Sequence, residues 1–345
     1  DAIINVISPH THQYSPFDIY AKALQEFFKS HELTATEWDE NSSKMFHFLD
    51  RYQQEAYWSL MKIAHQHGGA FLCDGVGLGK TFVGLMLIER LILHEGKRVV
   101  LFAPKGAKDG VWSPHLKKWL PHIGGIDGNA DFSNLAVFSH TDLSRKGDFP
   151  ERFLRITELA DVVIIDEAHH FRNQGRRGNL EEEIEPSRYY KLYDLLDNTS
   201  RQKTLFMLTA TPVNNRLSDF RHMAELFTRQ DETYFARTLG VNNLRAHFNK
   251  MERELRNSIG IDPADVSEHM SEVQDILDAD KIVQQLVVQR SRNYVRESQF
   301  RETGKSTMFP DRSPPKVAGY SIRKTYGHLL DMFDILLGPF LLRSE

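Results

Sequence analysis

The sequence contains a single cysteine, Cys73, among 345 residues. One thiol can form no disulfide within the chain and cannot supply a thiolate zinc cluster, so neither is available to stabilise the fold. Cys73 lies at the end of a predicted buried strand, where a small apolar side chain favours a structural role over a reactive one.

Long apolar runs are also missing. No stretch approaches the ~18 consecutive apolar residues that a membrane-spanning helix needs, and the residues after Asp1 show no charged, apolar and small-residue leader. We therefore expect no membrane partner and a cytoplasmic location. The start at Asp1 rather than Met predicts that the sequence is a piece of a longer protein.

The chain has no excess of positive charge. Its formal net charge of −4 argues against a protein that coats nucleic acid generally, but it leaves room for one local basic groove. Hydrophobic content of 41% and charged content of 26% are typical of globular proteins, and the length allows two or three domains with a substantial core.

The strongest signal is a glycine-rich loop that ends in Lys80-Thr81. An apolar run, Ala70–Leu72, precedes the loop and an apolar helical pattern, Phe82–Leu93, follows it. Strand, glycine-rich loop, Lys-Thr and helix is the layout of a phosphate-binding loop, in which backbone N–H groups and the positive end of the helix face the anion. Lys80 would neutralise the β- and γ-phosphates and act in catalysis, and the Thr81 hydroxyl would bind Mg²⁺. The predicted nucleotide-binding residues of this loop are Asp74, Gly75, Gly77, Leu78, Gly79, Lys80 and Thr81.

A second strand pattern ends in two acidic residues. Four consecutive β-branched residues, 162–165, predict a strand buried on both faces, and Asp166-Glu167-Ala168-His169 follows directly. Two adjacent carboxylates repel each other, so the pair needs a cation. We expect Asp166 to hold Mg²⁺ and Glu167 to be the catalytic base that orients and deprotonates the attacking water.

A further strand, Lys203–Leu208, runs into Thr209-Ala210-Thr211-Pro212. Small hydroxyl residues at a strand end can hydrogen-bond to an acidic pair and respond to the nucleotide state. The residues predicted to couple the nucleotide to motion are His169, Thr209, Ala210 and Thr211.

In this order the motifs resemble the Swi/Snf-like branch of the superfamily-two DEAH-motif helicases and translocases. Asp74 stands where a strict phosphate-binding loop has glycine, as in the Asp-x-x-Gly-x-Gly-Lys-Thr variant of that branch, and Asn214-Asn215 extends the likeness. The resemblance covers residues 48–345, and the loose fit to nuclear members favours a bacterial one. It implies an α/β fold: a RecA-like P-loop NTPase lobe, with a parallel sheet flanked by helices and an inserted or appended all-α protrusion.

The resemblance also assigns residues outside the main motifs. Gln53, with Gln54 as the alternative, would read the adenine edge, because a glutamine amide offers both a donor and an acceptor. Lys105, at the end of the strand over 98–104, and Ser139 and Thr141, at the end of the next strand, would contact the nucleic-acid backbone. A solvated basic loop at Lys105 remains the alternative.

We expect residues 1–45 to form a lead-in of helix and loop and residues 46–215 to form the ATP-binding RecA-like lobe. Helical periodicity without a strand pattern from residue 217 to about 289 predicts the helical protrusion, residues 216–300. Residues 301–345 would then be a linker and C-terminal helix that lead to a second RecA-like lobe, which this sequence lacks.

The implied function is that of the ATP-binding lobe of an ATP-dependent double-stranded DNA translocase, with ATP and Mg²⁺ as cofactors. Its partners would be duplex DNA and the second lobe, whose arginines complete the hydrolytic site, so this piece alone should be nearly inactive. Two alternatives remain: a DEAH-type RNA or strand-separating helicase, and a nucleotide-gated interaction module without translocation.

Overall fold

The computed structural model describes residues 43–123, 134–147, 149–179, 184–197, 202–210, 217–259 and 279–304. The predicted N-terminal helix, Thr211 with the Asn214-Asn215 extension, and the predicted linker and C-terminal helix lie outside these residues. Within the described part of the chain, no helix is both long and apolar enough to cross a membrane.

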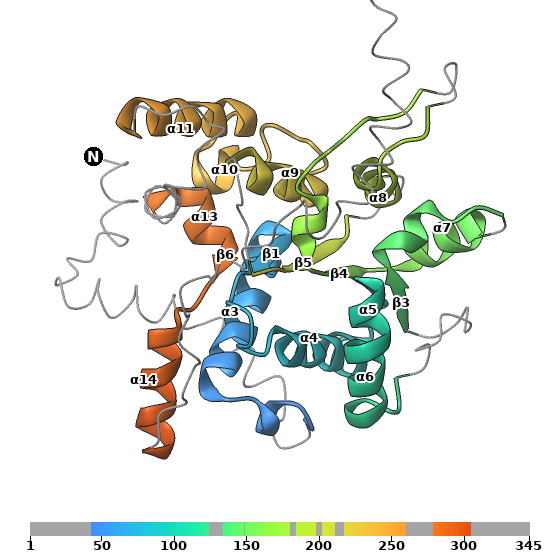
Figure 1. Cartoon of the computed structure of the whole chain (residues 1–345), viewed down its shortest axis with the longest axis vertical. Coiled ribbons are helices and arrows are strands. Elements are labelled where there is room, and N and C mark those ends of the chain that lie inside the picture. The colour runs from blue at the N-terminus through green and yellow to red at the C-terminus, as the bar shows by residue number, and fades with distance from the viewer. Residues whose placement is uncertain are drawn as a thin grey trace, which may run out of the picture. The chain divides into compact units, whose positions relative to one another are not determined.

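A six-stranded parallel sheet forms the centre of the lobe, in the order β3-β2-β4-β5-β1-β6. Figure 1 labels β6, β1, β5, β4 and β3, from β6 beside β1 to β3 at the opposite edge. Apolar side chains alternate between its two faces and are covered on both, which explains the near-continuous hydrophobic runs in the sequence. The predicted α/β fold with a flanked parallel sheet is therefore confirmed. The strands are β1 Gly69–Leu72, β2 Val99–Ala103, β3 Leu135–Ser139, β4 Val162–Asp166, β5 Thr204–Leu208 and β6 Val287–Val288.

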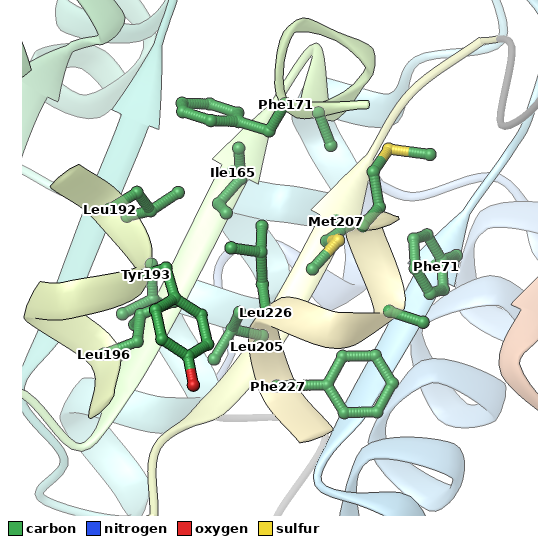
Figure 2. Packing of buried hydrophobic residues seen from close by; sticks show 14 of the residues in the cluster. Phe71, Ile165, Phe171, Leu192, Tyr193, Leu196, Leu205, Met207, Leu226 and Phe227 are labelled. Atoms are coloured by element: carbon green, nitrogen blue, oxygen red, sulfur yellow. The ribbon is translucent and has the colours of Figure 1, made fainter. Parts of the chain in front are cut away.

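Helices α7, α8 and α9 cover one face of the sheet, and α11 packs on the outside of α9. Figure 2 shows Phe71, Ile165 and Met207 from three strands packing against residues of α8 and α9, such as Leu192 and Phe227. These side chains are almost fully buried and form one continuous core. The helices are α7 Phe149–Leu159, α8 Arg188–Asp197, α9 Leu217–Thr228, α10 Ala236–Leu239 and α11 Leu244–Ile259.

Helices α3, α4 and α6 cover the opposite face (Figure 1). Leu72, Leu101 and Ile164 belong to the core on this side, together with the buried indole of Trp112. Trp112 reaches the sheet because α4 has a glycine, Gly84, where an added Cβ would lie 2.5 Å from the indole ring. The elements here are α3 Arg51–His67, α4 Lys80–Glu89, α5 Lys105–Ala107, a π-helical turn Lys108–Trp112 and α6 Ser113–Trp119.

Strand β6 corrects the expectation that residues 217–289 contain helices only. After helix α13, Lys281–Leu286, the chain adds β6 to the edge of the sheet beside β1, and then forms α14, Arg292–Thr303. A strand of two residues is too short to show a periodic pattern. The N–H of Cys73 donates to the carbonyl of Val288 at 2.8 Å, and burial raises the pKa of the Cys73 thiol, as its expected structural role requires.

Helix α9 confirms the helical periodicity predicted after residue 217 and packs directly on the sheet. Phe220 is fully buried, and its ring centroid lies 4.7 Å from that of Phe71 on β1. The helices after residue 217 therefore do not begin as a separate body, because α9 shares the core of the sheet.

Replacing Phe220 with alanine should lower the free energy of unfolding by about 3–5 kcal/mol, since the change leaves a large cavity between α9 and β1. Phe300→Ala is the matched control, because Phe300 is 61% exposed on α14 and its loss should cost under about 0.5 kcal/mol. Urea denaturation of both variants measures the difference. Equal stability of the two would contradict the placement of α9 in this core.

Candidate functional site

The parallel register aligns the ends of the central strands in one row. Asp166 of β4 pairs with Leu208 of β5, and Leu208 pairs with Leu72 of β1. The residues that follow these three positions therefore leave the sheet side by side. The structure brings together at this edge the glycine-rich loop, the acidic pair and Thr209, which the sequence predicted from three separate segments.

The glycine-rich loop ends at the start of α4. Gly77 and Gly79 have φ angles of 87° and 77°, in the left-handed region that favours glycine, and a Cβ on Gly79 would also overlap the Gln53 amide. Among the described residues, no carbonyl or side chain accepts from the backbone N–H groups of Gly77, Gly79, Lys80 and Thr81. Together these N–H groups form a set of unsatisfied donors that an anion can occupy.

The Lys80 ammonium lies over the same loop. Its Nζ donates to the carbonyl of Asp74 at 2.9 Å and to that of Gly75 at 3.4 Å. Thr81 follows in the first turn of α4 and is half-buried. The loop thus holds its own cation through carbonyl oxygens, which phosphate oxygens can replace as acceptors.

Gln53 joins helix α3 to the loop. Its Oε1 accepts from the Asp50 N–H at 3.1 Å, which caps the helix, and its Nε2 donates to the Leu78 carbonyl at 3.2 Å. The Tyr52 hydroxyl donates to the same carbonyl at 3.1 Å, and burial raises the pKa of Tyr52 to about 12. Gln54 instead holds the carbonyls of residues 46 and 49. Of the two glutamines, Gln53 is the one at the loop.

The Asp74 carboxylate is bound by Arg290, a partner that no motif indicated. Its Oδ1 accepts from the Arg290 backbone N–H at 2.8 Å, and its Oδ2 lies 3.5 Å from Arg290 Nη1. Both side chains are buried, and burial raises the pKa of the Asp74 carboxyl while Arg290 opposes that rise. The Asp74 side chain therefore joins the loop to the segment after β6, and it is the Asp74 carbonyl that meets Lys80.

The acidic pair occupies two different environments. Asp166 is 8% exposed; its Oδ2 accepts from Trp112 Nε1 at 2.7 Å and its Oδ1 accepts from the Glu167 N–H at 3.0 Å. Burial raises the pKa of Asp166, while the Trp112 indole and Lys80 act in the opposite direction. The Glu167 side chain is 34% exposed, and its backbone has a φ angle of 50°, a strained conformation for a residue with a side chain.

His169 connects Glu167 to the end of β5. Its Nδ1 lies 3.1 Å from Glu167 Oε2 and 3.3 Å from Thr209 Oγ1. The hydrogen bond with His169 is the largest cause of the lowered pKa of Glu167. Ala210 follows Thr209 directly, and Thr211 lies outside the described residues. The structure thus brings together His169 and Thr209, which the sequence predicted as coupling residues.

The predicted nucleic-acid contacts lie at the ends of β2 and β3. Lys105 is exposed at the start of α5, and Thr141 is exposed beyond β3. Ser139 is only 3% exposed, and its Oγ lies 2.9 Å from Thr141 Oγ1. Lys105 and Thr141 are therefore accessible to a partner, whereas Ser139 supports Thr141 from within the chain.

Known proteins resemble this chain in sequence over the segment that contains the site. Residues 47–214, a little under half of the chain, match the family model described as "Type III restriction enzyme, res subunit". A segment of 167 residues is 27% identical to the "Uncharacterized ATP-dependent helicase YqhH" of Bacillus subtilis, covering 48% of this chain and 27% of that protein. The chain thus spans about a quarter of the length of that relative.

Among solved structures, the "Sulfolobus solfataricus SWI2/SNF2 ATPase core in complex with dsDNA" aligns with a TM-score of 0.48 at 16% identity, covering 71% of this chain and 44% of that one. The corresponding "SWI2/SNF2 ATPase core domain" of the same organism aligns with a TM-score of 0.43 at 14% identity, covering 70% and 43%.

Replacing Asp74 with asparagine should lower the free energy of unfolding by about 3 kcal/mol or more, because it leaves the buried Arg290 guanidinium without its counter-charge. The double variant Asp74→Asn/Arg290→Met removes both charges and should lose less stability than the single variant. Chemical denaturation of wild type, the single variant and the double variant measures the three free energies of unfolding. Wild-type stability in Asp74→Asn would show that the ion pair does not hold the loop.

Proposed function

We propose that this chain, whose residues 47–214 form a helicase-like lobe of superfamily two, is the ATP-binding half of an ATP-driven motor that moves along double-stranded DNA. The observation that carries the proposal is the meeting of Lys80, Asp166, Glu167 and Thr209 at one edge of the parallel sheet. In this proposal residues 46–215 carry the nucleotide-binding motifs of the motor lobe. Residues 216–300, the predicted helical protrusion, also supply α9 to the core of that lobe and β6 to its sheet. Residues 301–345 are the link to a second RecA-like lobe. Residues 1–45 are its lead-in, and the motor works in the cytoplasm.

The loop suits the phosphates of ATP. The N–H groups of Gly77, Gly79, Lys80 and Thr81 have no acceptor in the described part of the chain, and the Lys80 ammonium needs only to exchange carbonyl for phosphate oxygens. Each exchange replaces a neutral acceptor with a charged one, which strengthens the hydrogen bond. Gln53 would bind the adenine by giving up its bond to the Leu78 carbonyl.

The residues also suit a divalent cation. Thr81 and Asp166 offer the hard oxygen ligands that Mg²⁺ prefers, and the charge of Lys80 acts against the burial that raises the pKa of Asp166. Bound there, Mg²⁺ would neutralise charge on the phosphates and orient them. Two donors hold the Asp166 carboxylate, so the residue is oriented before any cation arrives.

Glu167 fits the role of the general base. Its hydrogen bond with His169 lowers the pKa of its carboxyl, so Glu167 is ionised at neutral pH and can accept a proton from water. The Glu167 side chain, on a backbone with a strained φ angle of 50°, is more exposed than the buried Asp166 carboxylate and so more accessible to water. His169 then carries any movement of Glu167 to Thr209, and from there to Ala210 and Thr211.

The proposal also names duplex DNA as the partner along which the motor moves. Lys105 and Thr141 are exposed at adjacent strand ends, on the edge of the sheet where the coupling residues also lie. A lysine and a hydroxyl group at this edge can contact backbone phosphates without reading bases. The solved Sulfolobus core is named as a complex with double-stranded DNA, which agrees with this choice of partner.

The central experiment replaces Glu167 with glutamine in a protein that holds both lobes. ATP binding should remain and hydrolysis should fall by at least about 100-fold, because the amide cannot accept the proton of the attacking water. Glu158→Gln is the matched control, since Glu158 is exposed on α7 away from the site. Steady-state ATPase assays and nucleotide titrations give the two quantities, and turnover at the control rate would exclude Glu167 as the base.

The nucleic-acid partner is tested by adding duplex DNA, single-stranded DNA or RNA to the same two-lobed protein. Duplex DNA should give the largest stimulation of ATP turnover. Stronger stimulation by RNA or single strands would favour a strand-separating helicase. No stimulation, with no displacement of a triplex strand, would favour a nucleotide-gated interaction module.

The 345-residue chain by itself should bind ATP·Mg²⁺ weakly and turn it over far below about 1 s⁻¹, since in this proposal a second lobe would supply the arginines that stabilise the transferring phosphoryl group. The ATPase rate of the isolated chain with duplex DNA tests this. DNA-stimulated turnover at or above that rate would contradict the division of the site between two lobes.

A further inference from the structure

The indole of Trp112 lies between two parts of the proposed site, the Asp166 carboxylate and helix α4. The side chain is fully buried, and its Nε1 donates to Asp166 Oδ2 at 2.7 Å. Its ring packs on Gly84 of α4, the helix that begins at Lys80, so closely that an added Cβ would lie 2.5 Å from the ring and 3.2 Å from Leu208 of β5. One side chain therefore touches the proposed Mg²⁺ ligand and the helix of the phosphate-binding loop.

This hydrogen bond uses the one hydrogen-bonding group of the Trp112 side chain, its Nε1–H. An indole offers a single N–H donor and no acceptor, and in Trp112 that donor is used on the Asp166 carboxylate. The second oxygen of Asp166 accepts from the Glu167 N–H at 3.0 Å. Donors on both oxygens stop the carboxylate from rotating, and outer partners of this kind orient metal ligands.

The position of Trp112 is set by the backbone that precedes it. The indole is at the end of a π-helical turn, Lys108–Trp112, between α5 and α6. Turns of this type are rare and occur frequently at functional sites. Trp119, at the other end of α6, instead packs on Phe48 with ring centroids 4.2 Å apart.

We propose that Trp112 is a positioning residue that holds the Asp166 carboxylate in the orientation required for Mg²⁺ binding. The inference rests on the proposed function, because that function assigns Asp166 to Mg²⁺. Trp112 touches neither the cation nor the nucleotide. Its effect should appear as a loss of the Mg²⁺-dependent part of nucleotide affinity, and not of nucleotide binding as such.

The test compares Trp112→Phe with wild type by calorimetric titration of ATP into the whole chain, once with Mg²⁺ and once with EDTA. Phenylalanine keeps most of the ring and removes the N–H. We expect affinity in Mg²⁺ to fall about 10-fold, the scale typical of lost outer partners of metal ligands, with affinity in EDTA unchanged. Trp119→Phe, at the far end of the following helix α6, is the control and should leave both affinities as they are.

A second measurement needs no nucleotide. Loss of the indole N–H frees the Asp166 carboxylate to rotate, so the Glu167 N–H that it accepts should exchange with solvent faster in Trp112→Phe. The N–H groups of β5 should keep their wild-type protection, which separates this effect from general unfolding. Gly84→Ala keeps the indole but displaces its ring, and it should reproduce both changes if Trp112→Phe folds poorly.

Equal losses of affinity with Mg²⁺ and with EDTA would overturn the inference and make Trp112 a packing residue only. Unchanged affinities with unchanged Glu167 exchange would overturn it as well. If wild type binds no ATP, the proposed nucleotide site fails, and the exchange of the Glu167 N–H alone then decides whether Trp112 positions Asp166.

Discussion

The parallel register of the sheet is the constraint on which the rest of the site depends. Because Asp166, Leu208, Leu72 and Val288 lie in one row across β4, β5, β1 and β6, four segments leave the sheet at the same level. A shift of one residue in any pair would turn that strand's side chains to the opposite face and move its exit loop. The buried apolar faces fix the register, so the energy that positions the site comes mainly from core packing.

Local patterns predicted the strands and motifs because each is recorded in a short run of sequence. Buried parallel strands read as apolar runs, and a phosphate-binding loop needs glycines next to Lys-Thr, so β1 to β5, Lys80 and Asp166 could be placed from sequence. Their meeting at one edge also followed, since parallel strands end on the same side. The role of the loop residues remains a prediction that rests on this geometry.

The features that sequence did not reveal all depend on contacts between distant segments. The pairing of Asp74 with Arg290 joins residues 216 positions apart, and the hydrogen bond from Trp112 to Asp166 joins residues 54 positions apart. Strand β6 is two residues long and exists because β1 offers it an edge. A buried arginine or tryptophan has no periodic or motif signal of its own. Its role depends on a hydrogen-bond partner that is distant in the sequence and becomes a neighbour only in the folded chain.

These partners explain why a motif alone does not make a site. The Asp74 carboxylate accepts a hydrogen bond from the Arg290 backbone N–H, whereas Lys80 donates to the Asp74 carbonyl oxygen. The buried Asp166 carboxylate would otherwise be destabilised in its charged form, and the Trp112 N–H opposes that effect. Both partners are buried and neither belongs to a phosphate-binding or acidic motif. The orientation of the two carboxylates therefore depends on the packing of the segments that carry Arg290 and Trp112. Substitutions in those segments can alter the site although they replace no motif residue.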